Sequence, residues 1–494
     1  MFKALKFLAL AVSILLLGWG IAAGRRIPLS TSSAEAYSLY RQGDDHLTAF
    51  QFAAGVAKLE QALTLDPGFA MAAAALSEGY AKLGRKADAD SLADLASAMV
   101  PDVPHPVERM TIQLRLADNG CKRWIAARDS LLESLQKAAP DNLILLTGLA
   151  NQAKRADDPE AAARHYRRIL RDHPNFALAY NELGYLHFYR GEFTEALDML
   201  QRYAFLTPDA ANPYDSLGEV LTELGRYPEA EEQLVKALSL QSDYLPSLLN
   251  LTRVYLAQGQ VAKGTGLLAE IGRQMAGTAF ETRVREFAVG SYYAHQLWDD
   301  LDHATAEFIV LYPRHPKALL FRGMRLAVSS DPGLAVAVVD SFLGDWRQQT
   351  RYRDKPADLA RFEALECEFR ALISTNLGRY DEAAAHWSRA LGLHAGRQHP
   401  HDLVPLREQF GICLLAAGRP EEALGQAGEI FALNPNHPRA LVTAAEACLM
   451  LDRFQDAAGF LDRAAAVLAR ADPDFPLLLQ VQGLQHRLAD LAGS

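Results

Sequence analysis

The feature that most constrains this chain is a sequence repeat with a period of 34 residues. Leucines recur at this spacing, and alanines, prolines and glycines recur at it in other phases of the same repeat. The clearest series are Leu149, Leu183, Leu217 and Leu251; Ala162, Ala196 and Ala230, with Gly264 at the next step; Pro140, Pro174 and Pro208; and Gly191, Gly225 and Gly259. Several series in one register predict stacked units that each pack mainly against their neighbours.

Each unit predicts two antiparallel helices. In the unit Ala177–Pro208 the leading helix has Tyr180, Leu183, Gly184 and His187 on one face. Gly184 allows the second helix to approach closely, and Gly191 supplies the tight turn between the two helices. Ala196 is small enough for the point where the helices cross. Pro208 ends the second helix, because proline has no amide donor and clashes with the preceding turn.

These residues resemble the tetratricopeptide repeat (TPR) family, and the resemblance extends along nearly the whole chain in about twelve units. It implies an all-α, right-handed superhelical solenoid of antiparallel helix pairs. We expect an N-terminal array over residues 34–271 and a C-terminal array over 360–494 with a capping helix at its end. Residues 272–359 lose the phase of the repeat. They form either irregular helices that continue the stack or a flexible joint.

The start of the chain has a narrower resemblance, to the TPR sensor regions attached to bacterial serine/threonine kinases and winged-helix regulators. It rests on the segments 36–43, 62–67, 106–109 and 211–218. The kinase motifs H-R-D and D-F-G and a Gly-rich nucleotide loop are absent from the sequence. The resemblance therefore implies a sensor region without its effector domain.

Residues 1–26 have the composition of a membrane anchor or signal segment. Lys3 and Lys6 precede an apolar run at residues 7–24, and Arg25 and Arg26 follow it. Eighteen residues at about 1.5 Å each span about 27 Å, which is close to the thickness of a hydrocarbon core. We expect a retained single-pass anchor, with secretion after signal cleavage as the alternative. The charge balance favours a cytoplasmic N-terminus and an exported, periplasmic array.

Charge argues against nucleic acid as a partner. The formal net charge is -10, and removing the 4 basic residues of the first segment leaves -14. Binding to phosphates depends on Lys and Arg, so an acidic chain is a poor candidate for it. The cysteines Cys121, Cys367, Cys413 and Cys448 form no C-x-x-C pair and are expected to be small apolar residues inside helices.

We find no pattern typical of an enzyme, a cofactor site or a metal site. Phosphate-loop, H-E-x-x-H and G-x-S-x-G motifs are absent. His394, His399 and His401 lie near Asp402 in a Pro-containing connection, but their spacing matches no metal-ligand pattern. His187 and His295 are expected to take part in helix packing or to lie at its edge. No catalytic, cofactor-binding or metal-ligating residue is therefore predicted.

A partner is expected to bind where the leading helices line the concave side of the solenoid. The positions there that the buried pattern does not use are Asn151, Lys154, Arg155, Asn181, Tyr185, Phe188, Tyr189, Asp215, Glu219, Thr222, Asn250 and Arg253. Tyr185, Phe188 and Tyr189 form an aromatic arc beside amide and charged groups, which suits a bound peptide. The alternative is that these aromatics pack against a neighbouring helix.

The sequence thus predicts a non-enzymatic, membrane-tethered scaffold that binds a protein or peptide in its groove. A signalling sensor that acts through a separate kinase or regulator is the first alternative. A small-molecule binder or an enzyme in the irregular region is the second.

Overall fold

The computed structural model describes residues 29–313, scattered positions between 315 and 344, and residues 356–394 and 400–493. Within these ranges the regular structure is helical and contains no strand, so the expected all-α class is confirmed. The predicted N-terminal anchor or signal helix lies outside the described residues. None of the helices within them is long and apolar enough to span a bilayer.

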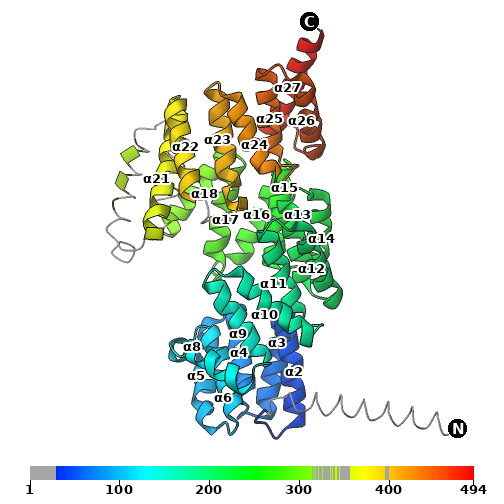
Figure 1. Cartoon of the computed structure of the whole chain (residues 1–494), viewed down its shortest axis with the longest axis vertical. Coiled ribbons are helices and arrows are strands. Elements are labelled where there is room, and N and C mark those ends of the chain that lie inside the picture. The colour runs from blue at the N-terminus through cyan, green and yellow to red at the C-terminus, as the bar shows by residue number, and fades with distance from the viewer. Residues whose placement is uncertain are drawn as a thin grey trace, which may run out of the picture. The chain divides into compact units, whose positions relative to one another are not determined.

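Two compact units make up the chain, with the boundary between Pro213 and Tyr214. The boundary falls within α13 (Ala211–Glu223) and therefore inside the segment expected to form the N-terminal array. The helices of unit 1 are α2 (Ala34–Thr48), α3 (Phe52–Leu65), α4 (Ala70–Lys82), α5 (Lys86–Met99), η1 (Val100–Asp102), α6 (Pro106–Asp118), α7 (Lys122–Ile125), α8 (Arg128–Ala138), α9 (Leu143–Arg155), α10 (Pro159–Asp172), α11 (Ala177–Tyr189) and α12 (Phe193–Leu206) (Figure 1).

Unit 2 continues the pairing of helices along the chain. After α13 its described helices are α14 (Tyr227–Leu240), α15 (Leu245–Ala257), α16 (Val261–Met275), α17 (Glu281–Ala294), α18 (Trp298–Leu311), α21 (Pro356–Asn376), α22 (Tyr380–His394), η3 (Pro400–Leu403), α23 (Val404–Ala416), α24 (Pro420–Phe431), α25 (Pro438–Met450), α26 (Phe454–Val467) and α27 (Pro476–Gly493). Two of them, α17 and α18, lie in the stretch where the repeat loses its phase. They still pack as a pair, around Val289, Leu301 and Phe308.

The repeat residues do what their spacing predicts. Gly191 and its equivalents 34 and 68 residues later have φ values of 76°, 70° and 72°, which a residue with a side chain rarely adopts. A Cβ on Gly184 would lie 2.8 Å from Leu200 Cγ, so the glycine permits the close approach of α11 and α12. Ala196 is fully buried at this crossing. The two-helix unit is therefore encoded locally by small residues at the turn and at the contact.

Each unit has its own hydrophobic cores. In unit 1, Tyr166 and Tyr203 of the second helices α10 and α12 are among the largest fully buried side chains. In unit 2, Trp387 and Phe410 pack in the core of α21–α24. Truncating one such aromatic to alanine would cost about 3–5 kcal/mol. Cys367, Cys413 and Cys448 are buried, Cys121 is half-buried, and all four are free thiols.

One feature of unit 2 is not contained in the repeat. The turns after α13 and α15 contact segments about two hundred residues later in the sequence. The side-chain amide of Asn434 donates to the Tyr227 hydroxyl at 3.2 Å, and Asn436 donates to the Gly225 carbonyl at 3.3 Å. The amide of Asp472 donates to the Gly259 carbonyl at 2.9 Å. The turns after α13 and α15 are therefore joined to the segments that precede α25 and α27, and the two groups of helices meet there (Figure 1).

Candidate functional site

The predicted groove residues of unit 1 lie on α9 and α11. Lys154 is exposed and forms an ion pair with Glu182, with 2.5 Å between Lys154 Nζ and Glu182 Oε2. Arg155 is also exposed, and its guanidinium lies 3.6 Å from Asp118. Asn151 is half-buried, whereas Asn181 is buried. Both basic residues thus remain accessible although each has a carboxylate neighbour.

The aromatic arc divides into a buried part and an exposed part. Phe188 is 5% exposed, and its ring centroid lies 6.0 Å from that of Phe193 on α12. Tyr189 is 54% exposed, with its ring 5.5 Å from Phe188 and 6.2 Å from Tyr185. Packing against a neighbouring helix therefore accounts for Phe188, while Tyr189 presents an aromatic face to solvent.

The remaining predicted residues lie on α13 and α15 of unit 2. Asp215, Thr222 and Asn250 are buried, whereas Glu219 and Arg253 are half-buried. Asp215 Oδ1 accepts hydrogen bonds from Ser247 Oγ at 2.9 Å and from Asn250 Nδ2 at 3.1 Å.

The buried acid on α13 has a strongly perturbed ionisation. Burial and the nearby Glu219 raise the pKa of Asp215 to about 7, against the hydrogen bonds from Ser247 and Asn250, which lower it. The hydrogen bond between Asp215 and Asn250 thus connects α13 to α15 beneath the surface, and both side chains take part in the contact between these helices.

Thr222 and Arg253 border a cavity of about 370 Å³ that sequence analysis did not predict. Its walls come mainly from the leading helices α13, α15, α17, α23 and α25, together with Tyr227 of α14, η3, the connection before α25 and the start of α27. The residues that line it are Thr222, Glu223, Tyr227, Arg253, Leu256, Ala257, Phe287, Gly290, Ser291, Ala294, His295, His401, Val404, Pro405, Glu408, Asn434, His437, Pro438, Arg439, Phe475 and Leu477.

One wall carries an ion pair between Glu223 of α13 and Arg253 of α15. His401 from η3 reaches the same carboxylate, with 3.4 Å between His401 Nδ1 and Glu223 Oε2. Burial alone would raise the pKa of Glu223, but Arg253 and His401 together lower it to about 2. Glu223 also raises the pKa of Arg253. The two charges on this wall are therefore mutually compensated.

The charges of Glu408 and Arg439 in the same lining are less well compensated. Glu408 of α23 lies 3.6 Å from Arg439 Nε and 3.7 Å from His437 Nδ1, and both distances are longer than a hydrogen bond. Arg439 instead donates to the side-chain oxygen of Gln296 at 3.1 Å. Burial lowers the pKa of Arg439, and Glu408 offsets this only in part.

His295 at the end of α17 faces several cationic groups. Burial, followed by Arg439, His437 and Arg253, lowers its pKa to about 3. His295 is therefore neutral at physiological pH and can serve as a hydrogen-bonding group. From the sequence, His295 is expected in helix packing or at its edge, because nothing in the local pattern shows that α17 lies near α25.

The histidine cluster noted in the sequence does not come together as a metal site. His394 is buried and hydrogen-bonds Glu368, with 2.7 Å between Nε2 and Oε1, while His401 lies in the cavity wall. His399 lies outside the described residues. In the part of the chain that the structure describes, no group of three or more potential ligands could hold a metal ion.

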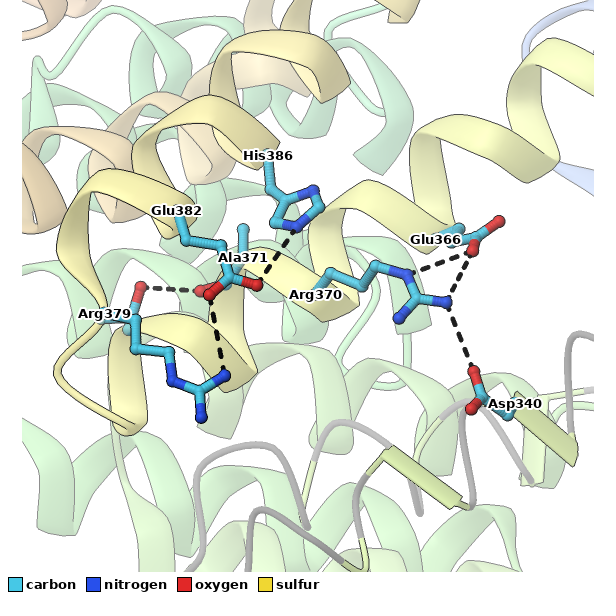
Figure 2. A network of polar contacts seen from close by, with 8 residues as sticks. Asp340, Glu366, Arg370, Ala371, Arg379, Glu382 and His386 are labelled. Atoms are coloured by element: carbon cyan, nitrogen blue, oxygen red, sulfur yellow. Dashed lines mark hydrogen bonds and ion pairs between the residues drawn. The ribbon is translucent and has the colours of Figure 1, made fainter.

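Further polar contacts lie on α21 and α22, each mainly within its own helix (Figure 2). Arg370 pairs with Glu366 at 2.8 Å and with Asp340 at 3.4 Å. Glu382 lies 3.8 Å from Arg379 and 3.9 Å from His386. Ion pairs as exposed as these contribute about 0–1 kcal/mol, so the network accounts for local packing only.

Comparison with known proteins identifies the repeats. Residues 147–213 and 414–480 each match a family model described as Tetratricopeptide repeat. These two segments are therefore tetratricopeptide repeats, one on each side of the boundary between the units, and the predicted repeat type is confirmed there.

Individual relatives are similar over part of the chain or at low identity. Superkiller complex protein 3 of Mus musculus is 29% identical over 108 residues, which cover 22% of this chain and only 7% of that protein. The crystal structure of yeast Tom70 covers 92% of this chain and 96% of its own, with 12% identity and a TM-score of 0.38. Pseudomonas aeruginosa pilF covers 44% of this chain and 99% of its own, with 16% identity and a TM-score of 0.34.

Proposed function

We propose that the protein is a non-enzymatic interaction scaffold that binds a protein segment on the leading helices of unit 1. The observation that carries the proposal is the exposed aromatic surface of α11, where Tyr189 is 54% exposed beside Tyr185. Exposed tyrosines provide apolar contact area together with a hydroxyl, and they are common anchors in interfaces. Tetratricopeptide repeats in general serve as protein-binding scaffolds, which supports this class of function.

Charged groups near the tyrosines would add specificity. Lys154 and Arg155 keep 43% of their side-chain surface exposed although they have acidic neighbours. They can therefore donate hydrogen bonds to a bound segment without first breaking a fully buried ion pair. Asn151 belongs to this proposed surface only as far as it is accessible. The predicted positions on α13 and α15 lie in unit 2 and are not part of the surface proposed for unit 1.

We further propose that residues 7–24 tether the scaffold to a membrane, with the array exported to the periplasm. Secretion after cleavage of this segment is the alternative. Both rest on the apolar run and its flanking charges. Fractionation of cells that express the full chain, followed by N-terminal sequencing, tests them. A mature N-terminus after Gly24 would contradict the retained anchor.

The resemblance to kinase-attached sensor regions supports a second proposal, in which the chain senses a ligand and acts through a separate kinase or regulator. The specific observation in its favour is the cavity of unit 2, which has a volume of about 370 Å³. A sensor needs a site that can hold a small molecule, and cavities of about 300–1,000 Å³ are typical of such sites.

Site-specific photo-crosslinking tests the scaffold directly. A photoreactive phenylalanine analogue at Tyr189 should crosslink the full-length chain to one specific protein in cells. The matched control is Phe205 on the second helix α12, which is 84% exposed and lies outside the proposed surface.

The partner found in this way then allows a quantitative test. Tyr189→Ala should weaken its affinity about tenfold, which is about 1.4 kcal/mol, whereas Phe205→Ala should not change it. Equal crosslinking from both positions, or unchanged affinity in Tyr189→Ala, would overturn the proposed surface.

A further inference from the structure

The cavity of unit 2 contains a cationic side chain whose charge is poorly neutralised. Arg439 is 13% exposed, and its nearest carboxylate, on Glu408, is 3.6 Å away and also lies near His437. Its hydrogen bond to Gln296 is with a neutral amide. A buried cation without a hydrogen-bonded carboxylate is costly, and an anion placed beside it recovers much of that cost.

Two neighbouring groups reinforce the preference for an anion. His437 Nδ1 is buried and has no hydrogen-bond partner in the described part of the chain. His437 is also the N-cap residue of α25, and its side chain does not cap the helix. Pro438 at the first position has no amide hydrogen, and the N-cap side chain accepts from none of the amides that follow it in the first turn of α25. Negative charge is favoured at such a helix end.

The charge of the cavity limits how much negative charge it can accept. Glu223 and Glu408 balance Arg253 and Arg439 when the histidines are neutral. One added negative charge can be shared by Arg439 and the start of α25. A dianion such as phosphate would place two charges next to Glu408, which is only 8% exposed and is also deprived of water. A monoanion is therefore the better match.

The lining also has apolar residues, among them Leu256, Phe287, Val404 and Leu477, beside neutral polar ones such as Thr222, Ser291 and Asn434. A volume of about 370 Å³ accommodates a small organic molecule and is too small for a protein segment of several residues. The ligand should therefore combine one negative group with a short apolar body.

We propose that the cavity of unit 2 binds a small monocarboxylate, with its carboxylate on Arg439 and the first turn of α25 and its apolar body against Phe287 and Leu256. A planar guanidinium matches a carboxylate in geometry as well as in charge. This inference does not depend on the scaffold proposed for unit 1, because none of the residues that carry that proposal, from Lys154 to Tyr189, lines the cavity.

Isothermal titration of the full-length chain in detergent tests the ligand class. The probes are butyrate, hexanoate and benzoate, each paired with its neutral amide, and inorganic phosphate. At least one carboxylate should bind at least tenfold more tightly than its amide and than phosphate. If no carboxylate binds, or if amide and carboxylate bind equally, the proposal is wrong.

Two variants locate the site. Arg439→Gln should weaken carboxylate binding at least tenfold, whereas Arg453→Gln, an exposed arginine paired with Asp456 on α26, should leave it unchanged. Gly290→Leu places a side chain into the cavity from α17, where a Cβ meets no described atom within 4 Å, and it should abolish binding. It should not destabilise the helix, because leucine is the better helix former.

Gly290→Leu keeps the test decisive if Arg439→Gln fails to fold. Its matched control is Gly266→Leu on α16, a helical glycine with equally open space that does not line the cavity. Arg439 and Gln296 also border a second cavity of about 400 Å³. Carboxylate binding that survives Gly290→Leu would place the anion there and would overturn the proposed site.

Discussion

The same repeat position has different surroundings in the two units. Tyr189 ends α11 in unit 1, and Glu223 ends α13 thirty-four residues later in unit 2. Tyr189 is 54% exposed, whereas Glu223 lies in a cavity wall and is held by Arg253 and His401. The repeat thus specifies which face of a leading helix is left uncovered by the neighbouring repeats. It does not specify whether that face contacts solvent or a distant segment of the same unit.

The turn glycines show the same contrast. Gly191, Gly225 and Gly259 share a positive φ and a repeat position. A Cβ on Gly191 would meet no described atom within 4 Å, but on Gly225 it would lie 2.0 Å from Asn434 Oδ1 and on Gly259 2.5 Å from Phe475 Cδ1. A residue chosen for a local turn therefore also permits a long-range contact in unit 2, and substitutions can separate these two roles.

The largest effect is expected from alanine at the turn glycines. Gly191→Ala should cost about 1–2 kcal/mol, because only the left-handed backbone conformation is strained. Gly259→Ala should cost about 3–5 kcal/mol, since the added Cβ also meets buried Phe475 and lies 2.7 Å from Ala471 Cβ. Urea denaturation gives the loss of stability, and hydrogen exchange should show faster exchange in α27 for Gly259→Ala alone. Equal losses in both variants would contradict a second role for Gly259.

The next effect concerns the acid at the end of α13. The pKa of Glu223 is about 2 in the folded chain, below its value of about 4.3 when unfolded, so its ionised form stabilises unit 2 fully above about pH 4.5. That contribution is lost as the pH falls from about 4.5 to 2. Glu223→Gln should cost about 2 kcal/mol at pH 7, because Arg253 loses its carboxylate, and the loss relative to wild type should shrink over this pH range.

Urea denaturation of wild type and variant between pH 2 and pH 7 checks the role of Glu223. Glu229→Gln is the control, since Glu229 is exposed and pairs with Arg226 within the same helical turn. A stability difference between wild type and Glu223→Gln that does not change with pH would show that Glu223 acts without its charge.

A smaller effect is expected from Asp472, which lies between α26 and α27 and caps the N-terminus of α16. Asp472 Oδ2 accepts a hydrogen bond of 2.7 Å from the amide of Ala262, in the first turn of α16. Asp472→Ala should cost about 1 kcal/mol, as for other lost N-caps. Asp474→Ala, two residues further and also at the surface, should cost nothing measurable. The amides of the first turn of α16 should exchange faster in Asp472→Ala only.

Local features of the fold were predictable from the sequence because they depend on residues within one repeat. The positive φ of Gly191 and the close packing at Gly184 and Ala196 follow from a turn and a crossing that recur every 34 residues. On α11, two neighbouring residues of the predicted site differ in burial: Tyr189 is exposed, whereas Phe188 is buried and packs against Phe193. A one-residue step around a helix, about 100°, is enough to move a side chain from surface to core.

The cavity could not be predicted, because the residues that form it are related by no sequence spacing. Their neighbours in the sequence predict helix packing or its edge for His295 and a connection between repeats for His401. They line one cavity because unit 2 brings α17 and η3 together with α25. The available signals were isolated polar residues within apolar helices, such as Glu408 and Arg439. Nothing in a single sequence shows that such residues share a site.

The smallest effect is expected from the exposed ion pair that also joins the two ends of unit 2. Arg470 Nη1 lies 2.8 Å from Glu231 Oε2, but the arginine side chain is 55% exposed. Arg470→Gln should cost at most about 0.5 kcal/mol, and the loss should vanish at about 1 M salt, since water and ions already screen the pair. Arg202→Gln, which breaks an exposed pair with Asp198 in unit 1, should behave in the same way. A loss above about 1 kcal/mol for Arg470→Gln alone would mean that surface charge holds these segments together. A small loss would mean that these segments are held together instead by the packing around Gly259 and by the hydrogen bonds of Asn434 and Asp472.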